Sequence, residues 1–194
     1  MAPKTSAPQP RAIRLYLLTY NTTAALFWLH ILLTTLSTLL SSSSSPNISS
    51  VYTSLEPWTR CAQTLAVAEI LHAATGIIHS PIFTTFTQVF ARSVQVWAIN
   101  YAFPAVTASS RPYPAMLLAW ATADVVRYCY FAVMLAGWSI PGVLKWLRYS
   151  LFIVLYPVGI GGEWWLMYKA TTVTSNWAVA GIFYFFLCLY VPGE

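Results

Sequence analysis

Residues 155–163 read LYPVGIGGE and lie within an apolar segment, 144–168, that is long enough to cross a lipid bilayer. A charged carboxyl at membrane depth costs about 2.5 to 3.5 kcal/mol on insertion scales, so an acid such as Glu163 indicates a functional site. Seven residues are nearly two helical turns, so Tyr156 and Glu163 share one helical face with their backbones roughly 10 Å apart. This spacing leaves room for a small substrate between the phenol and the carboxyl.

The whole chain has the composition of a membrane protein. Of its 194 residues, 58% are hydrophobic and 8% are charged, and the mean hydropathy is +0.62. Soluble domains carry many more charged residues than this. The formal net charge of +5 comes from scattered basic residues that form no cluster able to neutralise a nucleic-acid backbone. We therefore expect contact with membrane lipid and no nucleic-acid partner, with the basic residues anchoring helices at the membrane surface.

Six apolar segments predict an all-α membrane protein, a six-transmembrane-helix bundle. Each segment can supply the roughly 17 to 25 residues of a spanning helix. They are residues 15–40, 58–79, 82–103, 114–138, 144–168 and 170–191. Residues 1–14 are polar and basic, and we expect them to be disordered. Residues 15–194 then form a single domain, in which we find no internal repeat.

The distribution of basic residues predicts the orientation of the bundle. An even number of spans places both termini on one side of the membrane, where we count five basic residues against three on the other side. The five are Lys4, Arg11, Arg14, Lys145 and Arg148, and the three are Arg60, Arg111 and Lys169. This bias favours cytosolic termini. Asn47 then begins a possible glycosylation motif in a lumenal loop. The alternative is that the motif lies too near the membrane to be modified.

Five charged residues fall inside the predicted spans, and their charges sum to minus one. They are Glu69, Arg92, Asp124, Arg127 and Glu163. Charges inside a membrane normally face the bundle interior and one another. The first four therefore either join helices through buried ion pairs or contribute to a site. Glu163 is the charge that is left after those four have paired.

The residues around Glu163 favour a pocket. Gly159, Gly161 and Gly162 lack a Cβ atom and let another backbone or a substrate approach closely. Pro157 is expected to kink the span beside Tyr156. The alternative is that Tyr156 belongs to aromatic packing and that Glu163 emerges at the membrane interface, where aromatic and acidic residues are ordinary.

Several other kinds of site are excluded by residue spacing. None of Cys61, Cys129 and Cys188 is followed by an arginine six positions later, so the nucleophile loop of a phosphatase is absent. The three histidines form no compact pair with a carboxylate, so we expect no metal. We find neither a glycine-rich phosphate loop nor a nucleophile elbow, and we expect no cofactor.

The segment around Tyr156 also matches the hallmark of a known family. Residues 144–159, LKWLRYSLFIVLYPVG, together with Glu163, resemble the 3-hydroxyacyl-CoA dehydratases of very-long-chain fatty acid elongation, also called protein tyrosine phosphatase-like proteins. Supporting matches are AEILH at 68–72, QVFAR at 88–92, Trp120 with DVVRY at 124–128, and YVPG at 190–193. The Tyr-Pro-x-Gly-x-x-x-Glu spacing, combined with Arg127 and Glu69, is far more specific than any one of these pieces.

The resemblance implies a six-span enzyme of the endoplasmic reticulum membrane. Such a hydro-lyase removes water from a 3-hydroxyacyl-CoA to give the trans-2-enoyl-CoA, the third step of each elongation cycle, alongside elongase and reductase components. The family pattern places the catalytic pair at Tyr156 and Glu163. Supporting positions fall on Glu69, Gln88, Arg92, Arg127, Arg148 and Gly159.

The chain departs from the family pattern at two places. Asp124 stands where relatives often carry glutamate, and the shorter side chain is expected to change its partner. Relatives usually continue beyond the position of Glu194 into a basic cytosolic tail, so retention in the endoplasmic reticulum is in question.

Dehydration needs a base at the carbon next to the thioester and an acid at the departing hydroxyl. We hypothesise that Glu163 is the base and Tyr156 the acid, and the opposite assignment stays open. Lys145 and Arg148 are candidates for the CoA phosphates, although a regular helix places them about 20 Å from Glu163. A catalytically silent scaffold of the elongation complex and a membrane transporter are the competing functions. Retention of both catalytic residues argues against the scaffold, and the missing repeat argues against the transporter.

Overall fold

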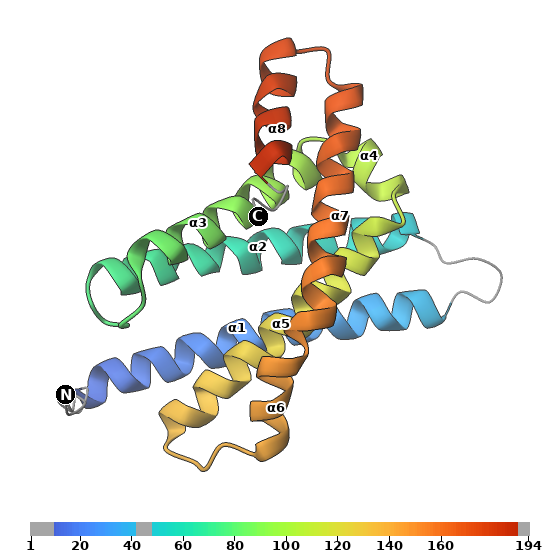
Figure 1. Ribbon diagram of the computed structural model, residues 1–194. Coiled ribbons are helices and arrows are strands. Elements are labelled where there is room, and N and C mark those ends of the chain that lie inside the picture. The colour runs from blue at the N-terminus through green and yellow to red at the C-terminus, as the bar shows by residue number, and fades with distance from the viewer. Residues whose placement is uncertain (1–9, 42–47, 190–194) are drawn as a thin grey trace.

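The computed structural model describes residues 10–41 and 48–189. In these two ranges the ordered elements are helices, which confirms the all-α class (Figure 1). They are α1 (Arg11–Leu40), α2 (Ile48–Ala74), α3 (Ile82–Ser93), the π-helix η1 (Val94–Tyr101), α4 (Pro104–Ser109), α5 (Pro112–Ala136), α6 (Gly142–Ser150), α7 (Phe152–Val173) and α8 (Trp177–Leu189). The motif at Asn47 and the family match at 190–193 lie outside the described residues.

Two of the predicted membrane spans, or three if a bent pair of helices counts as one, have the necessary length and composition among the described residues. The helices α1 and α5 are each long and apolar enough to cross a membrane. The helices α6 and α7 supply a third span if the two, which meet at an angle of 44°, count as one. The helix α1 begins at Arg11, so the last residues of the segment predicted to be disordered are helical. The division into a tail and one domain stays a prediction.

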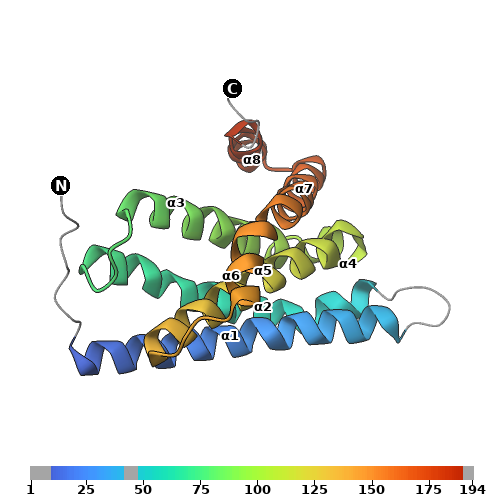
Figure 2. The same cartoon turned by 60° about the horizontal axis from the view of Figure 1, so that its bottom comes forward.

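The helices pack around α5, which contacts both α1 and α7 along its length. Figure 1 shows α5 crossing α1, with α3 beside α2 and α8 beside α7. In the turned view of Figure 2, α7 and α8 again lie together and α8 stays far from α1. Trp28 from α1, Leu117 from α5 and Leu166 from α7 are fully buried at these contacts. The core therefore lies where α5 meets its two main neighbours.

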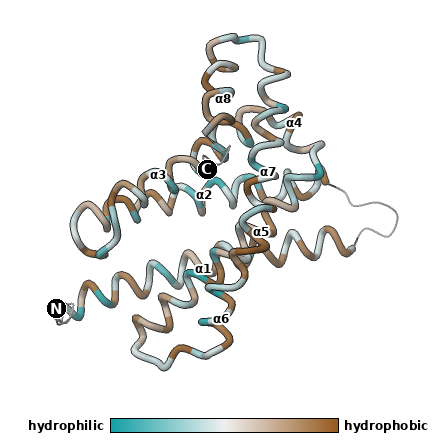
Figure 3. The backbone as a smooth tube through the Cα atoms, viewed as in Figure 1, coloured by the Kyte–Doolittle hydropathy of each residue, from teal (hydrophilic) through white to brown (hydrophobic). Residues whose placement is uncertain are grey.

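Much of the outer surface is apolar, as a lipid-facing surface must be. Phe83 is 78% exposed and Ile153 is 74% exposed, and other large hydrophobic side chains are exposed on every long helix. Figure 3 shows that α8 is hydrophobic along almost its whole length. Soluble monomers rarely expose contiguous apolar surface of this extent, so the structure agrees with the membrane class that the composition predicts.

Two predicted helices are broken at places that the sequence did not indicate. The segment 82–103 continues from α3 into the π-helix η1, in which Gln95 Nε2 donates to Asn100 Oδ1 at 3.1 Å. Residues five apart are neighbours in a π-helix, so this wider winding allows the contact.

The bend near Tyr156 comes at Leu151, six residues before Pro157, and α7 continues through the proline. Pro157 has no N–H, so one carbonyl in the first turn of α7 lacks its helical hydrogen bond. The bend comes just before this turn.

The end of α5 depends on a glycine and an arginine. Gly137 has φ = 80°, and its N–H and that of Trp138 bond back to Met134 O and Val133 O, which is a Schellman motif. Arg14 Nε from α1 donates to Leu135 O, another carbonyl of the last turn. A Cβ atom on residue 137 would lie 2.7 Å from Arg14 Nη2. The start of α1 and the end of α5 therefore hold each other in place.

We expect Gly137→Ala to destabilise the protein by about 1 to 2 kcal/mol, because an L residue is strained at positive φ. The new methyl group would also push Arg14 from its carbonyl. The measurement is thermal unfolding of the purified protein in detergent. Gly181→Ala in α8, where no atom lies within 4 Å of the added Cβ, is the matched control and should cause no loss. Equal stability of the two variants would contradict the prediction.

Candidate functional site

Glu163 is buried between α7 and α5. Its side chain is 7% exposed, and Trp120 Nε1 from α5 donates to Glu163 Oε1 at 2.8 Å. Trp120 is itself buried. Because the indole N–H is fixed by the packing of its ring, this bond sets the direction of the carboxylate. The alternative of a glutamate emerging at the membrane surface is therefore wrong.

The glycines before Glu163 bring the two helices together. A Cβ atom on Gly162 would lie 2.8 Å from Met116 Cβ and 3.2 Å from Pro112 O, so only glycine fits there without a shift of α7. A Cβ atom on Gly159 would make an ordinary contact of 3.5 Å with the Trp120 ring. The predicted close approach is confirmed at Gly162, and it brings the Glu163 carboxylate within reach of Trp120.

Arg92 from α3 lies on the other side of the same indole. Its guanidinium is 4.2 Å from the Trp120 ring centroid and 5.0 Å from that of Trp28. Arg92 Nη1 forms an ion pair with Asp124 Oδ2 at 2.7 Å. The remaining donors of Arg92, Nε and Nη2, are buried and have no hydrogen-bond partner among the described residues. Buried donors need a hydrogen-bond partner, which a ligand or an ordered water can supply.

Arg127 extends the chain of ion pairs to α2. Its Nε lies 3.2 Å from Asp124 Oδ1, and its two terminal nitrogens donate to Glu69 Oε2 and Oε1 at 2.9 and 3.1 Å. Tyr128 and Tyr20 also donate to Glu69. We call Glu69, Arg92, Asp124 and Arg127 the charged network. The predicted pairing of these four residues is confirmed, and two acids and two bases make the network neutral.

Tyr156 has surroundings unlike those of Glu163. It lies on α7 one turn before Gly159, 54% exposed, with its ring centroid 4.6 Å from that of Phe152. Among the described residues its hydroxyl makes no hydrogen bond. The ring contact with Phe152 is the aromatic packing that the alternative predicted for Tyr156. The acid of the predicted pair lies inside the bundle and the phenol lies at its surface, so the two side chains have different surroundings and not the shared substrate space that their spacing predicted. Their joint catalytic role stays a prediction.

Two further predicted site residues lie outside the charged network. Gln88 is exposed on α3, one turn before Arg92. Arg148 on α6 places its guanidinium 4.4 and 4.5 Å from the ring centroids of Tyr130 and Phe131 on α5. Arg148 therefore helps to hold α6 against α5 in this structure. The functional roles of Gln88 and Arg148 stay predictions.

Three aromatic residues at the site received no role from sequence reasoning: Trp120, Tyr20 and Tyr128. Trp120 lies four residues before Asp124, so helical spacing alone places both side chains on one face of α5. Tyr20 comes from α1, and nothing in the sequence links it to Glu69. His72 on α2 contacts α1, with its Nε2 2.8 Å from the Tyr16 hydroxyl.

Comparison with known proteins shows where this arrangement belongs. Residues 63–193 match the family model described as protein tyrosine phosphatase-like protein, PTPLA. The chain belongs to this family. The matched range contains Glu163, Trp120 and the whole charged network.

Curated relatives of the chain carry dehydratase names. A Schizosaccharomyces pombe protein named probable very-long-chain (3R)-3-hydroxyacyl-CoA dehydratase is 33% identical over 92% of this chain and 85% of its own length. The rice dehydratase PASTICCINO 2A is 33% identical over 93% of this chain and 86% of its own length. The Caenorhabditis elegans dehydratase hpo-8 is 37% identical over 78% and 68%. No solved structure matches the chain.

We expect Asp124→Leu to lower the free energy of unfolding by about 2 to 4 kcal/mol, because it leaves the partly buried Arg92 without its counter-charge. The measurement is unfolding in detergent followed by the loss of helical circular dichroism. Asp124→Glu keeps the charge and should lose much less. A similar loss in both variants would show that side-chain volume at this position matters more than its ion pairs.

Proposed function

We propose that this protein removes water from a (3R)-3-hydroxyacyl-CoA to give the trans-2-enoyl-CoA in very-long-chain fatty acid elongation. The observation that carries the proposal is the buried Glu163 carboxylate, oriented by Trp120 in a family whose curated relatives are named for this reaction. The site lies in the endoplasmic reticulum membrane, and the elongase and reductase components of the cycle are the expected partners.

In the proposed reaction Glu163 takes the proton from the carbon next to the thioester. Its Oε1 is held by the Trp120 N–H, so little reorientation of the carboxylate is needed during the reaction. Tyr156 gives a proton to the departing β-hydroxyl, which leaves as water. Because Tyr156 lies near the surface of α7 and Glu163 lies inside, the substrate lies along this helix with its acyl chain toward the apolar exterior.

The negative charge that develops on the thioester oxygen needs hydrogen-bond donors. Arg92 supplies two, since Nε and Nη2 are buried beside Trp120 without partners among the described residues. Its ion pair with Asp124 fixes the guanidinium before the substrate arrives. Donors that are preorganised in a water-poor site stabilise such a charge strongly. Lys145, exposed on α6, is the candidate contact for the CoA phosphates.

We further propose six membrane crossings with both termini in the cytosol. The crossings are α1, α2, α3 with η1, α5, α6 with α7, and α8. The apolar exterior supports this topology, as do the two helices of sufficient length and composition, α1 and α5, with α6 and α7 as a third span if they count as one. In this arrangement α6 and the bend before Tyr156 face the cytosol, where acyl-CoA is present.

We expect Glu163→Gln and Tyr156→Phe each to lower kcat by roughly 10²- to 10⁴-fold, the usual contribution of a positioned acid or base. The assay follows enoyl-CoA formation from 3-hydroxyacyl-CoA by mass spectrometry. In D₂O, exchange of the hydrogen next to the thioester should persist in Tyr156→Phe and disappear in Glu163→Gln. The reverse pattern would exchange the two roles, and full activity in either folded variant would remove that residue from the mechanism.

We expect Arg92→Lys to lower kcat by roughly 10²- to 10³-fold, the effect of losing one oxyanion donor. Lysine keeps the charge opposite Asp124 but lacks the planar fork of donors. Arg127→Lys is the matched control, since it makes the same exchange within the charged network and leaves the Arg92 donors in place. An equal fall in kcat for both variants would show that Arg92 stabilises the charged network and is not an oxyanion donor.

A further inference from the structure

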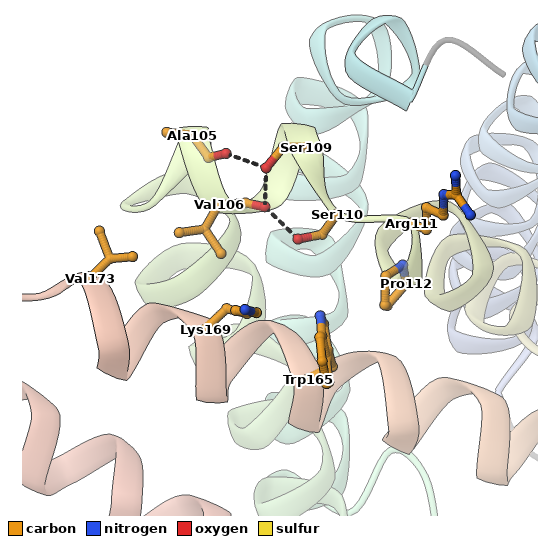
Figure 4. A pocket seen from close by; sticks show the side chains of 9 residues that line it. All are labelled: Ala105, Val106, Ser109, Ser110, Arg111, Pro112, Trp165, Lys169 and Val173. Carbon is orange, nitrogen blue, oxygen red and sulfur yellow. Dashed lines mark hydrogen bonds between the residues drawn. The ribbon is translucent and has the colours of Figure 1, made fainter. Parts of the chain in front are cut away.

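A cavity opens on a different face of α7 from Glu163. Its volume is about 780 Å³, and it lies between α4, the first residues of α5 and the last turns of α7 (Figure 4). Trp165, Lys169 and Val173 line it at intervals of four residues, which is one helical stripe. The stripe that packs on α5 contains Gly162, Leu166 and Ala170 instead. The cavity is therefore separate from the proposed catalytic site.

Two of the residues that line this cavity are cationic, Lys169 and Arg111. Figure 4 shows Trp165 and Lys169 extending from α7 toward α4, while Arg111, next to the start of α5, directs its guanidinium away from them. Neither Lys169 nor Arg111 has a carboxylate partner among the described residues, and the closest recorded contact of Lys169 Nζ is the Trp165 ring, at 5.3 Å. The hydroxyls of Ser109 and Ser110 donate to carbonyls of α4. A ligand that balances this set of charges is an anion.

The remaining walls are apolar, so the ligand also has a hydrophobic part. Ala105 and Val106 of α4 face Val173 of α7 across the opening. The volume lies within the range of roughly 300 to 1,000 Å³ that is typical of small-molecule sites. The cavity also lies at the ends of apolar helices, where tryptophan and basic side chains meet lipid head groups.

We propose that this cavity binds an anionic phospholipid of the surrounding membrane. Lys169 contacts the phosphate, the Arg111 side chain turns toward it from the rim of the cavity, and the Trp165 indole N–H donates to a head-group oxygen. The first part of an acyl chain lies against Val106 and Val173. The lipid thereby joins α4 to α7, and it does so independently of the dehydration reaction.

The experiment uses the full chain in nanodiscs of phosphatidylcholine with phosphatidic acid, followed by native mass spectrometry of the lipids that stay bound. Phosphatidic acid should be retained in preference to phosphatidylcholine. Arg111→Gln combined with Lys169→Gln should weaken its retention by roughly 10- to 30-fold, because each basic residue near an anionic lipid contributes about 1 kcal/mol. Val106→Trp, which fills the cavity and keeps both charges, should also abolish retention.

The matched control is Arg11→Gln combined with Arg60→Gln, which removes the same charge from positions outside this cavity. It should retain phosphatidic acid as the unchanged protein does. Equal loss in the two double variants would overturn the proposal in favour of diffuse attraction, as would equal retention of the two lipids. Displacement of the lipid by 3-hydroxyacyl-CoA would also overturn it, because the cavity would then belong to the substrate. Unchanged helical circular dichroism in each variant shows that the protein has folded.

Discussion

The carboxylate of Asp124 is the point on which the polar interior depends. It is buried on α5, and it pairs with Arg92 from α3 through one oxygen and with Arg127 through the other. Arg127 then reaches Glu69 on α2. A charge in an apolar bundle is tolerated only when it is paired and hydrogen-bonded. This requirement fixes α2, α3 and α5 relative to one another more strictly than apolar packing, which tolerates small shifts.

The charged network and Glu163 meet at Trp120. The face of its indole lies against Arg92, while its N–H donates to Glu163. One side chain therefore connects the ion pairs that hold α2, α3 and α5 with the carboxylate that α7 contributes. The close contact at Gly162 makes this connection possible, because a wider separation of α5 and α7 would put Glu163 out of reach of the indole. Stability and the proposed chemistry thus share the same contacts, and a substitution in the network is expected to affect both.

Local patterns in the sequence predicted a large part of this arrangement. Apolar length predicted the helical class, and the excess of acids over bases within the spans predicted four paired charges with Glu163 left over. The glycines before Glu163 predicted a close approach, which Gly162 makes with Met116 and Pro112. The bend was predicted at Pro157, but it comes at Leu151. The π-helix was not predicted either, since the extra residue in its turn leaves no mark in apolar spacing.

The sequence by itself determined that the chain is helical, that it belongs in a membrane, and that its few charges must find one another, because isolated charges and open backbone are too costly in lipid. Only the tertiary structure decided which charges pair, that Trp120 orients Glu163, and that Tyr156 lies exposed while Glu163 is buried. The contacts between different helices join residues 32 (Arg92 and Asp124), 43 (Trp120 and Glu163) and 58 (Glu69 and Arg127) positions apart in the chain. Helical periodicity specifies the face on which a side chain lies, but the partner on another helix is selected by how the helices pack together.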